Sequence, residues 1–300
     1  MKIIITGGAG FIGKHLADFL LNEKHEVTIL DNFSNSTKES INSLVSKGVN
    51  VIEGDITNSE FISKAFEKQE VVIHLAAKIS VDESIKNPSE THNVNVEGTK
   101  IILNSCKENR IKKLVAASSA AVYGESTLHK KIDEKTLTNP ISPYGESKVR
   151  MELEIEKFSK ENNLNYTILR FFNIFGIGQS PEYAGVITKF IDRINQNKSL
   201  QIFGDGLQTR DFISIRDIIQ AINNSLFTKK NGKYNVASGK TTTIKKLAEL
   251  MISMSGKELE IEFLEEKKGD IKFSEADISL AKKEIEFLPK IGIEDIKNFL

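Results

Sequence analysis

The sequence lacks an excess of charge of either sign, cysteines that could pair, and long apolar runs. Its 41 basic and 41 acidic side chains balance, so nothing indicates a nucleic acid as partner. The single cysteine, Cys106, excludes a disulfide within the chain, and its apolar neighbours indicate a buried side chain rather than a nucleophile. No apolar run approaches the roughly 18 residues that span a membrane, and residues 1–5 are too short for the core of a signal peptide. We therefore expect a cytoplasmic protein that does not associate with a membrane.

Short apolar runs rich in β-branched residues predict six buried strands separated by helical stretches. These runs lie at residues 1–5, 26–30, 49–53, 71–75, 114–117 and 166–169. Their alternation predicts an α/β fold with a doubly wound parallel Rossmann sheet and right-handed crossovers. Beyond residue 173 the rhythm loosens, and residues 212–237 predict one more β-α-β passage that returns to the sheet. We expect a smaller C-terminal lobe to be formed by the remaining residues.

A glycine-rich turn joins the first predicted strand to the first predicted helix. Gly7, Gly10 and Gly13 follow the spacing G-x-x-G-x-x-G. Without Cβ atoms, the chain can turn sharply at Gly7, a pyrophosphate can approach the backbone near Gly10, and the helix can pack on the strand at Gly13. The N–H groups of the first helical turn, which includes Phe11 and Ile12, then face that anion. The turn therefore predicts a dinucleotide site.

A second phosphate-binding pattern overlaps this turn. Gly8, Gly13 and Lys14 read G-x-x-x-x-G-K, but the phosphate loop of nucleotide hydrolases and kinases needs Ser or Thr next, and position 15 is histidine. Asp31 separates the two patterns, because it ends the second predicted strand at about the 20-residue spacing expected for a carboxylate that binds a ribose. Its charge repels a 2′-phosphate, which favours NAD over NADP.

Distinctive residues follow the ends of the predicted strands. In a doubly wound parallel sheet, ligands bind outside the carboxyl ends of the strands. The residues at these positions are Gly7, Asp31, Asp55, Ala76, Ser119 and Asn173. We therefore expect one edge of the sheet to hold the functional site.

Tyr144 and Lys148 stand four residues apart. Ser142 and Pro143 can cap and begin a helix, which puts both side chains on one helical face. A phenol with a reference pKa of about 10 is protonated at pH 7, but an ammonium group beside it and the positive nicotinamide ring favour phenolate, a general base. Ser119 adds a hydroxyl that can hydrogen-bond the same substrate oxygen. These three are the candidate catalytic residues.

Seven motifs occur along the chain, at residues 6–13 (TGGAGFIG), 54–56 (GDI), 74–77 (HLAA), 95–99 (NVEGT), 118–124 (SSAAVYG), 144–148 (YGESK) and 170–173 (RFFN). As a set they resemble the motifs of extended short-chain dehydrogenases of the nucleotide-sugar epimerase/dehydratase group, and most of all those of UDP-glucose (UDP-galactose) 4-epimerases. The resemblance implies NAD as cofactor, no metal, and Ser119, Tyr144 and Lys148 as catalytic residues. The residues it implies for NAD binding are Gly7, Gly10, Phe11, Ile12, Gly13, Asp31, Asn32, Asp55, Ile56, Leu75, Ala76, Ala77, Asn95, Tyr144 and Lys148.

The same resemblance implies 4-epimerisation of a UDP-hexose through a 4-keto intermediate. It predicts UDP-glucose and UDP-galactose as substrates, and also UDP-GlcNAc and UDP-GalNAc, because Ser274 stands where a bulky Tyr restricts the sugar pocket of some relatives. Many relatives have Arg where Lys267 stands. The residues implied for substrate binding are Ser80, Val81, Ser119, Tyr144, Asn173, Arg210, Asp270 and Ser274, with Arg210 as a cation for the diphosphate.

The expected domain organisation follows from these assignments. Residues 1–173 form an NAD-binding Rossmann domain, to which 208–240 return, and residues 174–207 and 241–300 form a substrate-binding lobe. The resemblance further implies a homodimer, formed through helices near residues 90–109 and 145–163. His74 and Tyr123 are expected to be packing residues.

Two other functions are open from the sequence alone. One is a nucleotide-sugar 4,6-dehydratase, decarboxylase or 4-reductase of the same fold. Dehydratase relatives carry an acidic pair where this chain has Ala120 and Ala121, so the dehydratase is disfavoured. The other is a non-catalytic NAD-binding regulator. The intact Ser119, Tyr144 and Lys148 argue against it, because a sensor needs no base with a lowered pKa.

Overall fold

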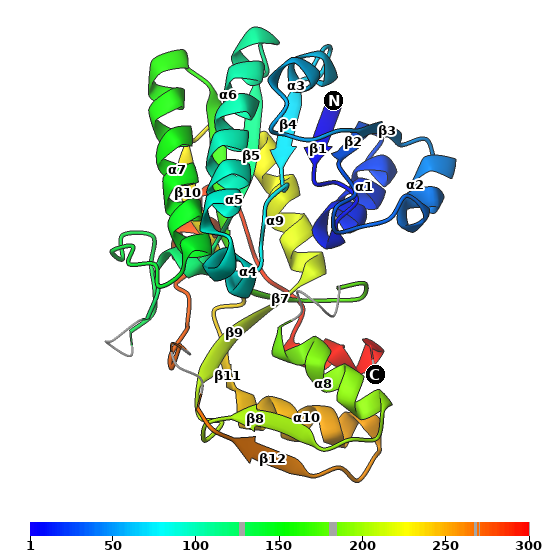
Figure 1. Ribbon diagram of the computed structural model, residues 1–300, viewed down its shortest axis with the longest axis vertical. Coiled ribbons are helices and arrows are strands. Elements are labelled where there is room, and N and C mark those ends of the chain that lie inside the picture. Colours follow the sequence, from blue (N-terminus) through cyan, green and yellow to red (C-terminus); the bar gives the residue numbers. More distant parts are fainter. Residues whose placement is uncertain (126–129, 180–184, 267–268, 270, 300) are drawn as a thin grey trace.

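The computed structural model describes residues 1–125, 130–179, 185–266, 269 and 271–299. Among them, the main sheet has seven strands in the spatial order β10-β6-β5-β4-β1-β2-β3, and all neighbours are parallel (Figure 1). The strands are β1 (Lys2–Thr6), β2 (Glu26–Asp31), β3 (Asn50–Glu53), β4 (Val71–His74), β5 (Lys113–Ser119), β6 (Asn165–Phe171) and β10 (Gly232–Val236). The six predicted strands and the doubly wound α/β fold are confirmed.

The central strands form because their short apolar runs are buried on both faces of the sheet. Ile3, Ile4 and Ile5 of β1 are completely buried, and β4 is buried along its whole length. The parallel register then brings the carboxyl ends of the strands to one level, where Thr6 of β1 pairs with His74 of β4. Residues that follow these strands therefore meet at one edge.

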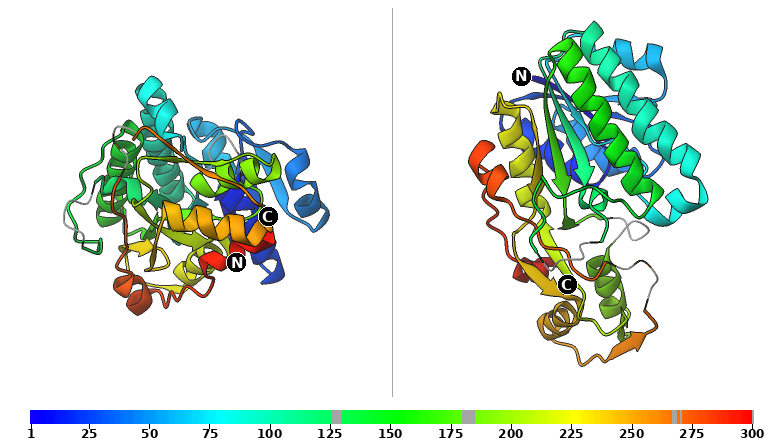
Figure 2. Two further views of the ribbon diagram at one scale, coloured as in Figure 1. Left: turned by 90° about the horizontal axis from the view of Figure 1, so that it is seen from below. Right: turned by 90° about the vertical axis from the view of Figure 1, so that its left-hand side faces the viewer.

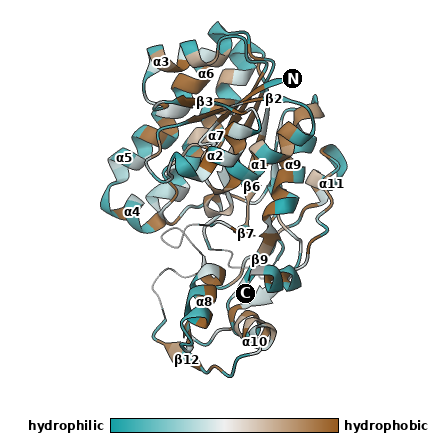
Figure 3. Cartoon of the chain, turned by 90° about the vertical axis from the view of Figure 1, so that its right-hand side faces the viewer, coloured by the Kyte–Doolittle hydropathy of each residue, from teal (hydrophilic) through white to brown (hydrophobic). Residues whose placement is uncertain are grey.

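Helices cover both faces of the sheet. Helices α1, α2, α9 and α11 cover one face, and helices α3, α6 and α7 cover the other (Figure 2). Apolar residues lie on the strands between these layers, and polar residues lie on the outer sides of the helices (Figure 3). The helices are α1 (Phe11–Asn22), α2 (Asn42–Ser46), α3 (Ser59–Ala65), α4 (Val81–Lys86), α5 (Pro88–His92), α6 (Gly98–Glu108), α7 (Pro143–Asn162), α8 (Val186–Asn195), α9 (Ile215–Phe227), α10 (Ile244–Ser255) and α11 (Ser279–Glu284), with shorter turns η1 (Glu39–Ile41), η2 (Asn93–Glu97), η3 (Ala120–Val122) and η5 (Ile293–Phe299). Within the described ranges, no helix has both the length and the apolarity needed to cross a membrane.

A smaller lobe lies beyond the carboxyl edge of the main sheet, in the lower half of Figure 1. It has a hydrophobic core of its own, to which α8, α10 and β8 contribute most of the buried side chains. Two small sheets belong to this part of the chain, one of order β11-β9-β7 and one of order β12-β8. Their strands are β7 (Asn173–Phe175), β8 (Leu200–Phe203), β9 (Thr209–Ser214), β11 (Thr241–Thr243) and β12 (Ile261–Leu264).

The predicted β-α-β passage at residues 212–237 is only half right. Its last strand, β10, joins the main sheet beside β6, but its first strand, β9, pairs with β7 and β11 instead. The apolar run at residues 212–215 fits a strand in either sheet. Such a run indicates that the strand is buried, but it does not indicate which strand pairs with it. The helix between them, α9, does pack on the main sheet.

Substitution of Gly13 by Ala tests the packing of α1 on the glycine turn. An added Cβ would lie 2.5 Å from both the Cα and the O atom of Gly8, so backbone must move. We expect the free energy of unfolding, measured by urea denaturation, to fall by about 1–3 kcal/mol. Gly185→Ala is the matched control, because a Cβ there meets nothing within 4 Å. Equal stability of the two variants would contradict this packing.

Candidate active site

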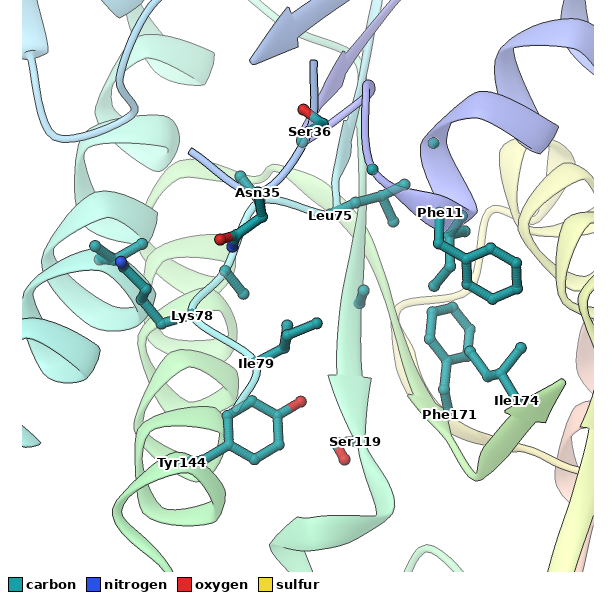
Figure 4. Close-up of a pocket in the computed structure, with 18 of the residues that line it drawn as sticks. Phe11, Asn35, Ser36, Leu75, Lys78, Ile79, Ser119, Tyr144, Phe171 and Ile174 are labelled. Atoms are coloured by element: carbon teal, nitrogen blue, oxygen red, sulfur yellow. The ribbon is translucent and has the colours of Figure 1, made fainter. Parts of the chain in front are cut away.

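A cavity of about 670 Å³ opens at the carboxyl edge of the main sheet and extends to α8 of the smaller lobe (Figure 4). It collects most of the residues predicted from the sequence. Those that line it are Gly7, Gly10, Phe11, Ile12, Gly13, Asp31, Asn32, Asp55, Ile56, Leu75, Ala76, Ala77, Ser119, Tyr144, Lys148 and Asn173. As expected from the parallel sheet, the residues that follow the strand ends line one cavity.

The glycine turn forms one wall of this cavity. Gly7 has φ +68°, which favours glycine, and a Cβ there would lie 2.6 Å from the backbone N of Ala76. Gly10 precedes α1 and has no side chain to cap it, so the helix begins against the cavity with its partial positive charge uncovered. The residues present therefore fit the diphosphate of a dinucleotide.

Asp31 stands at the end of β2 and is 8% exposed. Its Oδ2 accepts a hydrogen bond from the N–H of Ala9 at 2.9 Å, and its Oδ1 accepts one from the N–H of Phe33 at 2.8 Å. The carboxylate thus ties the glycine turn to the polar segment that follows β2. Ser34, Asn35 and Ser36 of that segment also line the cavity, although they had not been predicted as site residues.

Asp55 follows β3 on the same side of the cavity. Burial alone would raise the pKa of its carboxyl, but hydrogen bonds from Thr57 and Asn32 and the charge of Lys78 lower that pKa on balance. The Thr57 hydroxyl donates to Oδ1 at 2.7 Å, and the Asn32 amide donates to Oδ2 at 2.8 Å. Asp55 is therefore held as an anion at the same end of the cavity as Asp31, where the sequence predicts a ribose.

Tyr144 and Ser119 lie close to each other in the cavity, at the start of α7 and the end of β5 (Figure 4). The helix begins as predicted, because the Ser142 hydroxyl accepts the N–H of Gly145 at 3.1 Å. Burial raises the pKa of the Tyr144 phenol, and a hydrogen bond with Ser119 opposes that rise. The ammonium of Lys148, which the sequence places on the same helical face as this phenol, donates to the carbonyl O of Ala117.

Lys148 lies one turn beyond Tyr144 and is 4% exposed. Its ammonium donates to the carbonyl O of Ala117 at 3.0 Å, so it is bound to β5 close to Ser119. Burial lowers the pKa of Lys148 to about 8, and the carboxylate of Glu152 acts in the opposite direction. The ammonium therefore stays largely charged at neutral pH within the wall of the cavity.

Several predicted residues lie away from the described wall of the cavity. Asn95 is 1% exposed, and its amide binds the backbone of Lys78 and the hydroxyl of Ser147. Ser80 caps α4, where its hydroxyl accepts the N–H of Glu83 at 3.1 Å. Its neighbour Val81 is 43% exposed.

The residues predicted to bind the sugar nucleotide in the smaller lobe are also set back from that wall. The guanidinium of Arg210 donates to the carbonyl O atoms of Thr209 and Ile271. Ser274 is 7% exposed, three residues beyond Ile271. Asp270 and Lys267 lie outside the described residues, so the geometry of this segment does not bear on either.

The two residues expected to be packing residues are buried. His74 binds the hydroxyls of Thr6 and Thr99, at 2.7 and 3.0 Å, and burial lowers its pKa to about 3, so it stays neutral. Tyr123 is 3% exposed and donates to Asn235 at 2.6 Å. Both expectations are confirmed, and both side chains also satisfy buried polar partners.

Sequence reasoning missed part of the cavity. Lys78 and Glu90 line it and form an ion pair at 2.8 Å, and Ile79 lies beside them. Residues of the smaller lobe and its approach also line it, namely Phe171, Phe172, Ile174, Gln179, Gly185, Val186, Ile187 and Phe212. No sequence signal marks them as site residues, because apolar residues at helical or strand spacing predict core.

Comparisons with known proteins agree with this geometry. The model of the NAD-dependent epimerase/dehydratase family matches residues 3–237. A solved UDP-glucose 4-epimerase of Thermotoga maritima with UDP-glucose is 32% identical, with a TM-score of 0.94, over 99% of this chain and 96% of that one. A UDP-N-acetylglucosamine 4-epimerase of Methanobrevibacter ruminantium in complex with UDP-N-acetylmuramic acid is 36% identical, with a TM-score of 0.92, over 99% and 94%.

A third solved structure has a cofactor in its complex. It is a UDP-glucuronic acid 4-epimerase of Bacillus cereus with UDP-glucuronic acid and NAD, 34% identical, with a TM-score of 0.91, over 99% of this chain and 97% of that one. Together with the glycine turn and Asp31, these similarities place the chain in the NAD-dependent epimerase/dehydratase family.

Proposed function

We propose that this protein is an NAD-dependent UDP-sugar 4-epimerase. The observation that carries the proposal is the juxtaposition of Tyr144 and Ser119 in a cavity whose other wall is the glycine turn. A phenol and a hydroxyl that share a substrate oxygen suit removal of a proton from a sugar hydroxyl. Three relatives of similar length act on UDP-sugars at C4, which supports the same reaction here.

In the proposed mechanism, NAD supplies a hydride acceptor and donor at C4 of the hexose. Tyr144 as phenolate takes the proton of the C4 hydroxyl while Ser119 hydrogen-bonds the same oxygen, and a 4-keto sugar results. Lys148 holds a positive charge in the buried wall and favours the phenolate. Tyr144 returns the proton after the keto sugar has presented its other face, which inverts C4.

Inversion requires a firm hold on the diphosphate and a loose hold on the hexose. We propose that Arg210 supplies the former, because its guanidinium can pair with a phosphate in a bidentate manner. It is bound to the backbone of Ile271, on the segment that leads to Ser274. We therefore assign substrate binding to the smaller lobe, which faces the cofactor wall across the cavity.

The residues after Ser119 favour epimerisation over dehydration. Ala120 and Ala121 form the turn η3, and neither carries a group that could remove or return a proton at C5 or C6. A reaction confined to C4 needs only the Tyr144 proton. A dehydratase would need an acid and a base that this turn does not supply.

We further propose that the protein is a homodimer that buries α6 and α7. These helices lie side by side on one face of the main sheet (Figure 2). Leu153 of α7 is 57% exposed. Its position on an outer face of the helix suits an apolar contact with a second copy. Sedimentation equilibrium of the purified protein at the mass of one chain would refute the dimer.

Tyr144→Phe tests the assignment of the general base. Purified protein is incubated with UDP-glucose, UDP-GlcNAc and UDP-glucuronate, and the products are identified. We expect the wild type to form a C4 epimer, and kcat of the variant to fall about 100- to 10,000-fold, because the proton acceptor is lost. Tyr166→Phe, at the far end of the main sheet, should keep full activity. Near wild-type turnover by Tyr144→Phe would refute the mechanism.

Ser274→Tyr tests the width of the sugar pocket. We expect kcat/KM for UDP-GlcNAc to fall about 10-fold or more, because the phenol fills the space of the 2-acetamido group, while kcat/KM for UDP-glucose changes less. Ser274→Ala is the matched control and should keep both activities. A wild-type enzyme that strongly prefers the unacetylated sugar would contradict the proposed pocket.

A further inference from the structure

Glu152 lies outside the cavity, yet it is bonded to the elements that carry all three candidate catalytic residues. It is 2% exposed and lies on α7, one turn beyond Lys148 and two turns beyond Tyr144. Its Oε1 accepts the hydroxyl of Ser118 at 2.6 Å. Ser118 is the residue before Ser119 and lines the cavity, so the carboxylate of Glu152 is bonded to the end of β5 next to Ser119.

The second partner of Glu152 is Arg170 of β6. The guanidinium donates from Nε to Oε1 at 2.9 Å and from Nη2 to Oε2 at 2.6 Å, and both side chains are almost fully buried. Nη1 of Arg170 donates to the hydroxyl of Tyr123 at 2.8 Å, and that hydroxyl donates to Oδ1 of Asn235 of β10 at 2.6 Å. Both carboxylate oxygens are thus satisfied by fixed donors.

We propose that Glu152 is a positioning residue, which fixes α7 against β5 and maintains the positive charge of Lys148 without touching substrate or cofactor. This inference rests on the proposed epimerase function. Glu152 and Arg170 form a buried ion pair that has no role in the mechanism proposed above.

The geometric part of the proposal comes from two neighbouring bonds. Lys148 donates to Ala117 O, and Glu152 accepts from Ser118, so α7 is bonded to two consecutive residues of β5. The next residue along β5 is Ser119. Because these bonds hold the helix to the strand just before the cavity, they fix the separation between the Tyr144 and Ser119 hydroxyls.

The electrostatic part follows from the charges around Lys148. Burial lowers the pKa of this ammonium to about 8, and the charge of Glu152 raises it. Arg170 adds a second buried cation, so one carboxylate compensates two positive charges. Loss of that carboxylate moves the pKa of Lys148 further down, and more of the side chain becomes neutral at the pH of the reaction.

Other titratable groups face this cluster from the neighbouring elements. His74 of β4 stays neutral, because burial lowers its pKa to about 3. On the outer side of α7, Glu154 pairs with Lys100 of α6 at 3.7 Å. The remaining groups are Tyr144 on α7 itself, Tyr123 after η3, Tyr166 of β6, and Glu156 of α7 with Lys233 of β10. Among the charges on these described groups, only that of Glu152 raises the pKa of Lys148.

The test is Glu152→Gln, which keeps the shape and removes the charge. The pKa of Lys148 is measured in the NAD-bound protein by NMR titration of 13Cε-lysine, with the signal assigned by Lys148→Arg. We expect the midpoint to fall by about one pH unit. The alkaline limb of the kcat profile for UDP-glucose should shift to lower pH by the same amount, with KM little changed. Glu156→Gln, one turn further along α7, is the matched control and should change neither.

A second variant separates positioning from stability. In Glu152→Met with Arg170→Met, apolar residues of similar length replace the buried pair, a change that often preserves folding. We expect near wild-type thermal unfolding and a lowered kcat, because the bond to Ser118 is lost. The Lys148 midpoint should fall less than in Glu152→Gln, because the charge of Arg170 is removed together with that of Glu152. A folded Glu152→Gln variant with an unchanged Lys148 midpoint overturns the inference, and so does a folded double variant with wild-type kcat. If the wild type epimerises no UDP-sugar, the proposed function fails, while the lysine titration still decides the role of Glu152.

Discussion

Parallel pairing of the strands is the constraint on which the site depends. Because neighbouring strands run in one direction and are in register, every carboxyl end lies at the same edge of the sheet. Thr6 of β1 is level with His74 of β4, and His74 is level with Ala116 of β5. The glycine turn after β1 and Ser119 at the end of β5 therefore open into one cavity. The packing of Gly7 against Ala76 is close enough to exclude a Cβ, so the same contact shapes the cavity wall.

Buried charge is the second physical theme of this site. Burial lowers the pKa of Lys148 to about 8, the charge of Glu152 opposes that fall, and the ammonium donates to the carbonyl O of Ala117. Burial raises the pKa of Tyr144 and so favours its neutral phenol. The chain alone thus holds a charged lysine beside a protonated tyrosine. The positive nicotinamide ring of a bound dinucleotide would add a further bias toward phenolate.

The sequence predicts those parts of the molecule that local patterns determine. Buried parallel strands leave uninterrupted apolar runs, glycines mark the turn, and the four-residue spacing of Tyr144 and Lys148 marks one helical face. The parallel fold then brings Asp31, Ser119 and Tyr144 together without further information. The choice of sheet for β9 was wrong, because an apolar run does not specify its neighbours.

What the sequence could not supply are the tertiary partners. The pairing of Glu152 with Arg170 joins a helix to a strand 18 residues away, and no spacing rule connects the two. No sequence pattern predicts the ion pair of Lys78 with Glu90 in the cavity wall either. The burial of the Tyr144 phenol, which raises its pKa, was also out of reach, because burial follows only from the folded chain.

The central claim is that a sugar carbon is oxidised and reduced again within one site. The most direct measurement is the fate of deuterium at C4 of UDP-[4-²H]glucose when the purified protein converts it to its epimer in ordinary water. The account predicts that the product keeps the deuterium at C4, because hydride is stored in the site and returned. Epimer formed with hydrogen from the solvent at C4 would contradict it.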